Sequence, residues 1–433
     1  MSRQDRATET TLELLRQIFG AYEAQSFLVR LWDGTVWPGD RIGSPAFTIV
    51  LNHPGALRQM LLPPSELNLG ESYIYGDFDL EGDLIAAISL VDHFEKLDMA
   101  VGDKLGLAWR LQSLPQTRAP RDGRQAAQLS GAEHSRRRDR DAISYHYDVS
   151  HGFYALWLDR RMVYSCGYFG DPSDDIHTAQ ERKLDYICRK LRLEPGERLL
   201  DIGCGWGGLI MHAAEHYGVE AIGITLSQPQ VDLARKRIKD AGLEDRCRVE
   251  LLDYREVEPG PQPFDKLVSV GMFEHVGEVK MRAYFKHAWD ILRPEGLFLN
   301  HAIARPGWAP KAGADTFSNR YVFPDGELTP ISHSLRIAEE LGFEVRDVES
   351  LREHYALTLR HWVRRLEHRH KQALEHVDEA TYRVWRLFMS GSADGFESGR
   401  INVYQSLLLK PGPGGESGLP LTRAYLYADE LTR

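Results

Sequence analysis

Short apolar runs alternate with amphipathic stretches along the second half of the chain. The runs that indicate strands lie at 198–202, 220–225, 248–252, 266–270 and 297–301. The stretches with helical spacing include 208–217, 229–241 and 281–292. Alternating strands and helices predict an α/β domain with a parallel sheet that is covered by helices on both faces. Two later runs, at 344–348 and 401–409, predict an added antiparallel pair, and a helical insertion at 355–389 separates them.

The first 112 residues carry a shorter and more mixed pattern. An amphipathic helix is predicted at 8–22, followed by strand-like runs at 27–32, 35–37 and 47–51. Asp33-Gly34 stands between the first two runs, and Asp-Gly between alternating apolar residues is a signal for a β-hairpin. Helical patterns follow at 55–62 and 83–94. We therefore expect a small α+β domain at 1–112, ahead of the main domain at 141–433.

The segment at 113–140 is rich in Pro, Gly, Ser, Gln and Arg. Its arginines are Arg118, Arg121, Arg124, Arg136, Arg137, Arg138 and Arg140. Such a segment is either a solvated, flexible tether or a basic surface for an anionic membrane, where each Arg contributes about 1 kcal/mol. We expect a basic flexible linker, and the clustering of arginines in a chain of net charge −10 favours the membrane interpretation.

The length and composition are those of a protein with a substantial core. The chain has 433 residues, enough for two or three domains, and 42% of them are hydrophobic. No apolar run approaches the roughly 18 residues of a membrane span, and the polar N-terminus does not resemble a signal peptide. The four cysteines have neither metal-site nor disulfide spacing, which favours a reduced, cytoplasmic location. The net charge of −10 argues against general nucleic-acid binding.

A glycine-rich loop follows the first strand of the predicted sheet. The segment 199–208 reads Leu-Leu-Asp-Ile-Gly-Cys-Gly-Trp-Gly-Gly, so Gly203, Gly205 and Gly207 stand where side chains would block a ligand from the backbone. The loop lacks the lysine of a phosphate-binding P-loop. Its place at the carboxyl end of a parallel strand is where doubly wound folds bind ligands. We expect it to bind S-adenosylmethionine, with Asp201 orienting the loop or meeting the methionine amine.

The second strand ends differently from that of a dinucleotide-binding protein. An acidic residue is usual there for the ribose hydroxyls, whereas this chain has Thr225, Ser227 and Gln230. Asp253 and Tyr254, after the third strand, are the expected contacts of the adenine. The absence of an acidic residue after the second strand argues against an NAD enzyme and favours a narrower group of methyltransferases.

Several further motifs are rich in aromatic and polar residues. In chain order they are 144–150, 152–158, 162–169, 270–277, 299–303 and 354–359. Together with the glycine loop, these segments resemble the cyclopropane-fatty-acyl-phospholipid synthase family, which includes the mycolic acid cyclopropane synthases and related lipid C-methyltransferases. The resemblance covers nearly the whole chain. It implies a Rossmann-like class I methyltransferase sheet, a membrane phospholipid with an unsaturated acyl chain as substrate, peripheral contact with the inner face of the membrane, and a homodimer. We also expect the N-terminal domain at 1–112 to dock on the membrane and to help feed the acyl chain inward.

The resemblance also implies a bound bicarbonate that serves as the catalytic base. The matching residues here are Cys166, Glu274, His301, Ile303 and Tyr355. Cys166 and Ile303 would offer backbone N–H groups, His301 and Tyr355 would donate from their side chains, and Glu274 would accept the bicarbonate O–H. By the same analogy the cofactor contacts are Tyr164, Ser165, the glycine loop with Asp201, the segment from Thr225 to Gln230, and Asp253 with Tyr254.

The same residues can be interpreted without the family. Methylation of an alkene by a sulfonium creates a carbocation, and aromatic faces tolerate positive charge while excluding water. The motifs supply such rings, although ordinary core packing explains most of them. Cys166 could alternatively be a nucleophile, but alkene methylation needs no covalent enzyme intermediate. His301 could alternatively be a structural histidine at a strand end.

We therefore expect an enzyme that forms cyclopropane rings on phospholipid acyl chains. A sibling enzyme that makes methyl- or methylene-branched chains would share every cofactor motif. A methyltransferase of small molecules or polyketides and a catalytically silent lipid-binding protein are further alternatives. Ser392 stands where many phospholipid cyclopropane synthases have a cysteine, which leaves the product of this chain open.

Overall fold

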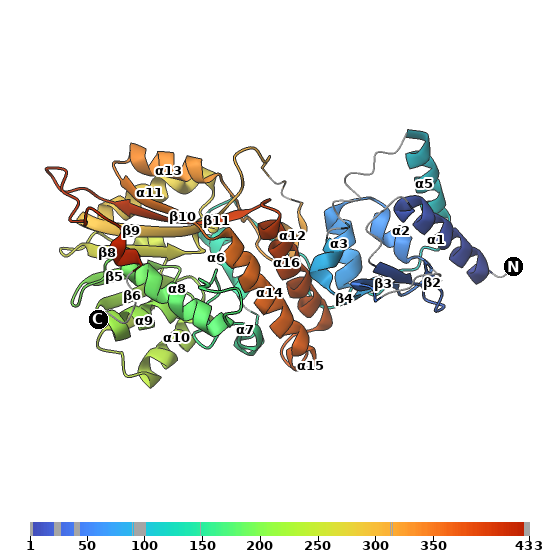
Figure 1. Cartoon of the computed structure of the whole chain (residues 1–433), viewed down its shortest axis with the longest axis horizontal. Coiled ribbons are helices and arrows are strands. Elements are labelled where there is room, and N and C mark those ends of the chain that lie inside the picture. The colour runs from blue at the N-terminus through green and yellow to red at the C-terminus, as the bar shows by residue number, and fades with distance from the viewer. Residues whose placement is uncertain are drawn as a thin grey trace. The chain divides into compact units, whose positions relative to one another are not determined.

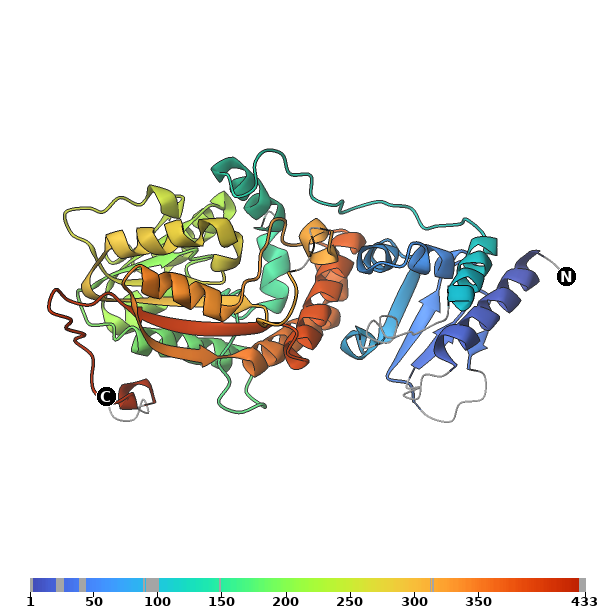
Figure 2. The same cartoon turned by 90° about the horizontal axis from the view of Figure 1, so that it is seen from above.

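The computed structural model describes residues 3–20, 27–38, 44–88, 90, 101–147, 149–311, 313 and 315–427 (Figures 1 and 2). The chain forms two compact units. The first comprises Met1–Ala126, Gly313–Val322 and Ala373–Asp394. The second comprises Ala127–Ala312, Phe323–Gln372 and Gly395–Arg433.

The second unit is built on a seven-stranded sheet in the order β10-β11-β9-β8-β5-β6-β7. Its strands are β5 (Arg198–Ile202), β6 (Glu220–Thr225), β7 (Cys247–Leu251), β8 (Phe264–Val270), β9 (Leu292–Ala304), β10 (Glu344–Ser350) and β11 (Asn402–Leu409). The strands from β5 to β9 run parallel, and β11 is antiparallel to both β9 and β10. The predicted parallel sheet with an added antiparallel pair is therefore confirmed.

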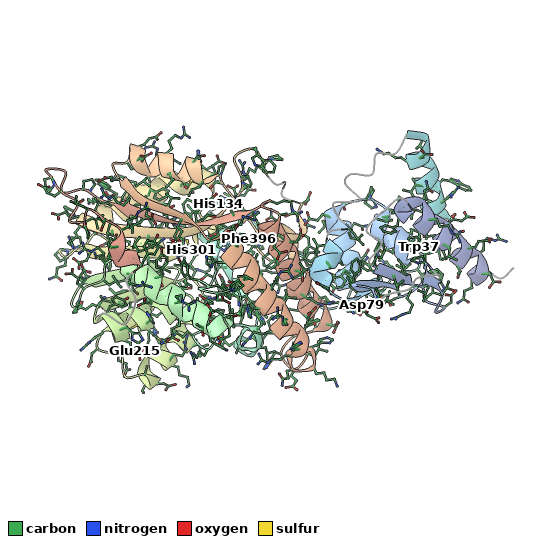
Figure 3. All side chains as sticks on the ribbon, in the orientation of Figure 1. Trp37, Asp79, His134, Glu215, His301 and Phe396 are labelled. Atoms are coloured by element: carbon green, nitrogen blue, oxygen red, sulfur yellow. The ribbon has the colours of Figure 1, made fainter. Side chains whose placement is uncertain are left out.

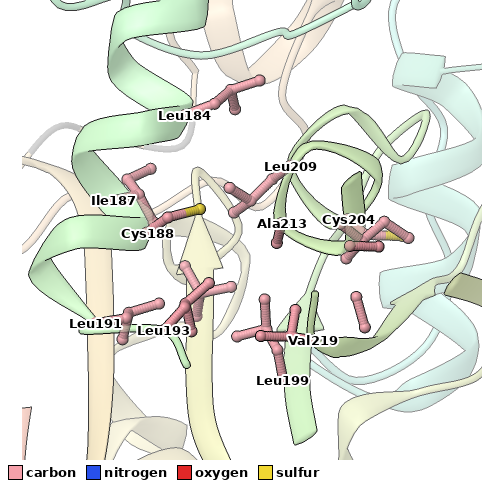
Figure 4. Close-up of a cluster of buried hydrophobic side chains, with 14 of the residues drawn as sticks. Leu184, Ile187, Cys188, Leu191, Leu193, Leu199, Cys204, Leu209, Ala213 and Val219 are labelled. Carbon is pink, nitrogen blue, oxygen red and sulfur yellow. The ribbon is translucent and has the colours of Figure 1, made fainter. Parts of the chain in front are cut away.

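Helices cover both faces of this sheet, as Figure 1 shows. The helices of the unit are α6 (Arg136–Tyr147), α7 (His151–Trp157), α8 (Ile176–Lys190), α9 (Gly208–Tyr217), α10 (Gln228–Asp240), α11 (Met281–Ile291), α13 (Ile331–Glu340) and α14 (Arg352–His368). The described part of this unit also contains the 3₁₀ turns η1 (Tyr254–Glu256), η2 (Phe273–His275), η3 (Glu278–Lys280) and η4 (Ala424–Leu426). One buried apolar cluster lies between the sheet and α8, α9 and α10, with Leu184, Ile187 and Leu209 among its members (Figure 4). A second lies beneath α11 and α13 and includes Phe285 and Ile337.

The first unit contains a four-stranded sheet in the order β2-β1-β3-β4. Its strands are β1 (Phe27–Arg30), β2 (Val36–Trp37), β3 (Phe47–Leu51) and β4 (Phe78–Gly82). The predicted Asp33-Gly34 hairpin is confirmed, since Val29 pairs with Trp37 across the antiparallel β1 and β2. The helices are α1 (Arg3–Phe19), α2 (Ala56–Leu61), α3 (Glu66–Ile74), α5 (Val101–Ser113) and α12 (Phe317–Tyr321). The later part of the helix predicted at 83–94 lies outside the described residues.

The first unit takes in two segments from far along the sequence. Phe317 of α12 lies so close to α3 that a Cβ at Gly70 would come within 2.4 Å of its ring. The side chain of Arg386 donates to the Tyr73 hydroxyl at 2.8 Å. The predicted insertion at 355–389 is therefore not one body: it forms α14, α15 (His370–Ala373) and α16 (Glu379–Glu397), and residues 373–394 belong with the first unit.

Several arginines of the predicted linker are bound within the protein. Arg121 donates to Asp77 at 3.1 Å, and Asp77 is fully buried, so its charge requires such a partner. Further along, Arg136 pairs with Glu256 at 3.0 Å, and Arg138 pairs with Asp325. The structure thus differs from the flexible basic tether that the composition predicts, because acidic groups elsewhere in the sequence neutralise these arginines. Among the described helices, none combines the length and apolarity of a membrane span.

Candidate active site

The glycine loop joins β5 to α9 at the carboxyl end of the parallel strands. The N–H groups of Gly203 and Cys204 both donate to the Ile224 carbonyl on β6, at 2.9 and 3.0 Å, which fixes the start of the loop. Gly203 has a φ of +88°, and a Cβ there would lie 2.8 Å from that of Met272. No residue other than glycine fits this position without strain. The loop borders a cavity of about 130 Å³.

Most of the predicted cofactor residues surround this one cavity. Those that line it are Tyr164, Ser165, Asp201, Gly203, Gly205, Thr225, Gln230, Asp253 and Tyr254. Gly207 does not line it. It is the residue before α9, with a φ of +80°, and its role is to begin the helix.

The polar residues after β6 form a buried set of their own. The Thr225 hydroxyl donates to Gln230 Oε1 at 2.6 Å and accepts the Ser227 N–H at 3.2 Å. These bonds hold the first turn of α10 against the cavity. On the opposite side Asp253 is bound by the Arg255 guanidinium through Nε at 2.8 Å. Burial would raise the pKa of Asp253, but the hydrogen bonds from Arg255 outweigh it and hold that pKa below its usual value.

Lys183 is a cavity residue that the sequence analysis missed. Its ammonium donates to the Ser165 hydroxyl at 2.8 Å, and only 1% of the residue is exposed. Burial lowers the pKa of Lys183 to about 8. Burial also raises the pKa of Asp201 to about 7, although the nearby Lys183 opposes the rise. The signal was present in the sequence, since Lys183 shares the buried face of α8 with Ala179 and Ile187 at helical spacing.

Glu274 lies at the end of the next parallel strand, in η2. Its Oε1 accepts the N–H of Ile303 at 2.6 Å, and its Oε2 is buried and has no partner among the described residues. Burial raises the pKa of Glu274 to about 7. This geometry corrects one expectation, because the Ile303 N–H is already engaged by Glu274 and is not open to an anion here.

His301 belongs to β9 and is buried in the second unit, where Figure 3 labels it. Gln405, its register partner on β11, places Nε2 at 3.3 Å from His301 Nδ1. Burial, with Lys183 and Lys190 nearby, lowers the pKa of His301 to about 3, so its ring is neutral. An amide N–H facing Nδ1 leaves the ring proton on Nε2. Nε2 is buried without a partner in the described part of the chain, so it is a donor that lacks an acceptor.

Cys166 and Tyr355 complete the predicted set. The Cys166 thiol donates to the Gly167 carbonyl at 3.2 Å, and burial raises its pKa far above the usual value. A thiol held in its protonated form is a poor nucleophile, which argues against the covalent alternative. The Tyr355 ring stacks on Phe396 at 4.6 Å between centroids. Burial raises the pKa of its hydroxyl, and the charges of Cys166 and Glu274 contribute to the rise, so these three groups share one region.

Aromatic rings join the two parts of the site. Tyr147 and Tyr164 both line the cavity, and both interact electrostatically with Tyr355. The Tyr164 ring lies 5.3 Å from that of Trp362 and 5.4 Å from that of Trp157. Phe273, by contrast, packs against Phe285 in the core beneath α11, which is the ordinary role for an aromatic residue. The aromatic cavity can hold a cationic or apolar ligand, and the same unit contains two buried polar atoms, Glu274 Oε2 and His301 Nε2, that lack a partner among the described residues.

Comparisons with known proteins agree with this arrangement. The family model described as mycolic acid cyclopropane synthetase matches residues 134–406, and a domain of unknown function matches residues 14–97. A probable fatty acid methyltransferase of Pseudomonas putida is 42% identical over 402 residues, which are 92% of this chain and 95% of that protein. The cyclopropane-fatty-acyl-phospholipid synthase of Escherichia coli K12 is 31% identical over 385 residues, which are 88% of this chain and 92% of that one. The crystal structure of mycolic acid cyclopropane synthase CmaA1, complexed with SAH and CTAB, superposes with a TM-score of 0.59 at 33% identity, covering 63% of this chain and 98% of that chain.

Proposed function

Because this chain belongs to the mycolic acid cyclopropane synthetase family, we propose that it is an S-adenosylmethionine-dependent methyltransferase that forms cyclopropane rings on unsaturated acyl chains of membrane phospholipids. The observation that carries the proposal is a pair of buried atoms, Glu274 Oε2 and His301 Nε2, that have no partner among the described residues. One is an acceptor and the other a donor, which is the complement of a small oxyacid. Met272 and His275, close to Glu274 in the sequence, line the cavity together with Tyr147 and Tyr164.

The cavity supports binding of the methyl donor. When bound, S-adenosylmethionine would supply an electrophilic methyl group. The structure of CmaA1, a relative of this chain, contains SAH, which is the cofactor after its methyl group has been transferred. Asp201 offers an unpartnered carboxylate oxygen for the methionine amine, and the glycine loop leaves the backbone open to the same part of the molecule. Thr225 and Gln230 replace the usual acidic residue at the ribose end.

The aromatic residues support formation of a cation on the acyl chain. Transfer of the methyl group to one alkene carbon makes the adjacent carbon positively charged until a proton is lost. Tyr147 and Tyr164 line the cavity, and a cation–π attraction to an aromatic ring is worth about 2 kcal/mol where water is excluded. Burial keeps the hydroxyls of both residues protonated, because it raises their pKa values above the usual range.

Ring closure requires a base, and the residues present fit a bound bicarbonate. Bicarbonate would take up the proton that the transferred methyl group loses. Glu274 Oε2 can accept its O–H, and His301 Nε2 and the Tyr355 hydroxyl can donate to its oxygens. The Ile303 N–H contributes by holding Glu274 Oε1, so that Oε2 is the free oxygen.

A methyl- or methylene-branched product is the second candidate. The fatty acid methyltransferase of P. putida, at 42% identity, carries a name of that kind. Ser392, in place of the cysteine expected from the family, is a further departure that leaves the product open. Both candidates share the methyl transfer and differ in where the proton leaves.

Expression in a bacterial host that makes no cyclopropane lipids tests the proposal. We expect acyl chains heavier by one CH₂, with the cyclopropane protons visible in the NMR spectrum of the extracted lipids. A methylene signal without cyclopropane protons would establish the second candidate instead. Methylation of soluble substrates, with none on vesicles, would reject both. The matched control is the Glu274→Gln variant, which keeps the cavity residues and should leave the lipids unchanged.

A further inference from the structure

Among the residues that the structure describes, none covers one face of helix α5 in the first unit. Leu111 and the following Leu114 are each 2% exposed and attach the helix to its unit. Leu105 and Trp109, in contrast, are 68% and 72% exposed. Figure 1 shows α5 projecting beyond α1 and α2 of the same unit. The exposure of two large apolar side chains to water is unfavourable, and an exposed apolar patch of this kind marks a surface that binds an apolar partner.

The order of residues around α5 is that of a helix lying at a membrane surface. At about 100° per residue, Leu105 and Trp109 point about 40° apart, on the side opposite Leu111. Lys104 and Arg110 project about 120° to either side of their midline. Arg110 keeps 45% of its side chain exposed and lies 3.8 Å from Glu13, so it is only loosely paired. An apolar centre with Trp, flanked by basic side chains that can reach the headgroups, is typical of interfacial helices.

The exposed face is too small for a stable contact with a second copy of the chain. Leu105 and Trp109 offer about 300 Å² of apolar surface, whereas a standard interface buries about 800 Å² on each partner. A bilayer needs no complementary shape, so a small apolar face suffices. Basic residues on both sides of the face match the negative surface of phosphatidylglycerol-containing membranes.

We propose that the face of α5 formed by Leu105 and Trp109 inserts into the boundary between headgroups and acyl chains of a phospholipid bilayer. The proposal rests on the proposed function insofar as the substrate is a membrane lipid. It moves membrane contact from the arginine-rich segment, where Arg121, Arg136 and Arg138 are bound internally, to α5.

Flotation of the full chain with vesicles of phosphatidylglycerol and phosphatidylethanolamine tests the proposal. The double variant Leu105→Ser, Trp109→Ser should lose at least tenfold in vesicle affinity. The matched control is Trp308→Ser, which removes a tryptophan that is 80% exposed outside α5 and should float like the wild type. Calorimetric binding of S-adenosylmethionine, unchanged in both variants, would show that each is folded.

A second measurement does not depend on loss of binding. A nitroxide attached at Leu105→Cys should become protected from a water-soluble quencher and accessible to oxygen when vesicles are added. Wild-type affinity in the double variant, or a label that stays in water, would overturn the proposal. A change from dimer to monomer in the double variant would assign the face to a second copy instead. Vesicle binding without any methyl transfer would leave α5 docking intact and reject the proposed function.

Discussion

Substitution of Glu274 by glutamine is expected to abolish turnover and at the same time stabilise the second unit. The amide has the same shape as the carboxylate and keeps one oxygen for the Ile303 N–H, which Oε1 accepts at 2.6 Å in the wild type. At the position of Oε2, however, it places an NH₂ group. That group donates, whereas the unpartnered Oε2 can only accept when ionised.

The loss of activity follows from the hydrogen bond at Oε2. A hydrogen bond to a charged group contributes about 1.5–3 kcal/mol, and a buried donor facing another donor costs about 1–3 kcal/mol. The sum of about 2.5–6 kcal/mol corresponds to a decrease in kcat of roughly 10²- to 10⁴-fold. The affinity for S-adenosylmethionine should not change, because Glu274 is absent from the lining of the cavity.

The gain in stability follows from the pKa of Glu274, which burial raises from 4.5 to about 7. Between these values the folded state holds a proton that the unfolded state releases, so stability falls as the pH rises through the window. A shift of this size costs about 3 kcal/mol of unfolding free energy above pH 7. Glutamine removes that cost but weakens the bond to Ile303 by about 1 kcal/mol. The net effect is a gain of about 2 kcal/mol at pH 8 and a loss of about 1 kcal/mol at pH 4.

Transfer of radiolabel from S-adenosylmethionine into lipid measures the first effect, and thermal unfolding at pH 4 and pH 8 measures the second. Stability that is lower than wild type at pH 8 would show that Glu274 is ionised and well solvated in the folded protein. Unchanged turnover would remove Glu274 from the reaction. Either result refutes the reasoning at a different step.

Three further predictions rest on other parts of the site. Gln405→Leu should lower kcat about tenfold or more without changing cofactor affinity, since His301 Nδ1 loses its donor; imidazole ¹⁵N shifts that keep a single tautomer would contradict this. Lys183→Met should weaken S-adenosylmethionine binding at least tenfold at pH 7 and less at pH 9, because the pKa of Asp201 rises further when the ammonium is removed; calorimetry that gives equal affinities at pH 7 would refute it. Gly203→Ala should destabilise the protein by about 2–4 kcal/mol, because residue 203 has a φ of +88° and a Cβ there would contact Met272. The control Gly242→Ala has a φ of +66° but open space around the Cβ, so it should cost only about 1–2 kcal/mol. Chemical unfolding measures both free energies.

The sheet of the second unit was largely predictable because its strands are marked locally. The ranges predicted for β5 and β6 agree with the structure, and α9 begins and ends where the apolar spacing indicates. A glycine at each end of α9 makes its boundaries visible in the sequence. β9, in contrast, begins at Leu292 rather than 297, because the strand includes the Pro294-Glu295-Gly296 segment, which has the composition of a turn and shifts the register against β8.

The grouping of distant segments was not predictable in the same way. α12 and the residues of α16 that bind Tyr73 have ordinary helical patterns, and nothing local indicates that they return to the first unit. Contacts between residues more than 240 positions apart, such as the one from Tyr321 to Glu71, depend on the folded chain.

The residues of the site likewise fall into those that local motifs indicate and those that only the folded structure identifies. Residues in glycine-rich or aromatic motifs, such as Asp201 and Tyr164, could be found from the sequence. The helical spacing indicates that Lys183 is buried, but it does not indicate what Lys183 does. The roles of Lys183 and Gln405 depend on the groups that face them in the folded protein. The engagement of Ile303 by Glu274 is likewise a property of the tertiary structure.

The position of β11 has a consequence for synthesis of the protein. β11 lies between β9 and β10, yet it is the last strand of its sheet in the sequence. While the chain emerges from the ribosome, β9 therefore remains an unpaired edge until residues 402–409 arrive, and such edges invite aggregation. The same strand brings Gln405 to His301. The pairing of β11 with β9 therefore protects the sheet edge and completes the site in the same late step. A nascent or truncated chain that lacks β11 has an exposed edge and an incomplete site.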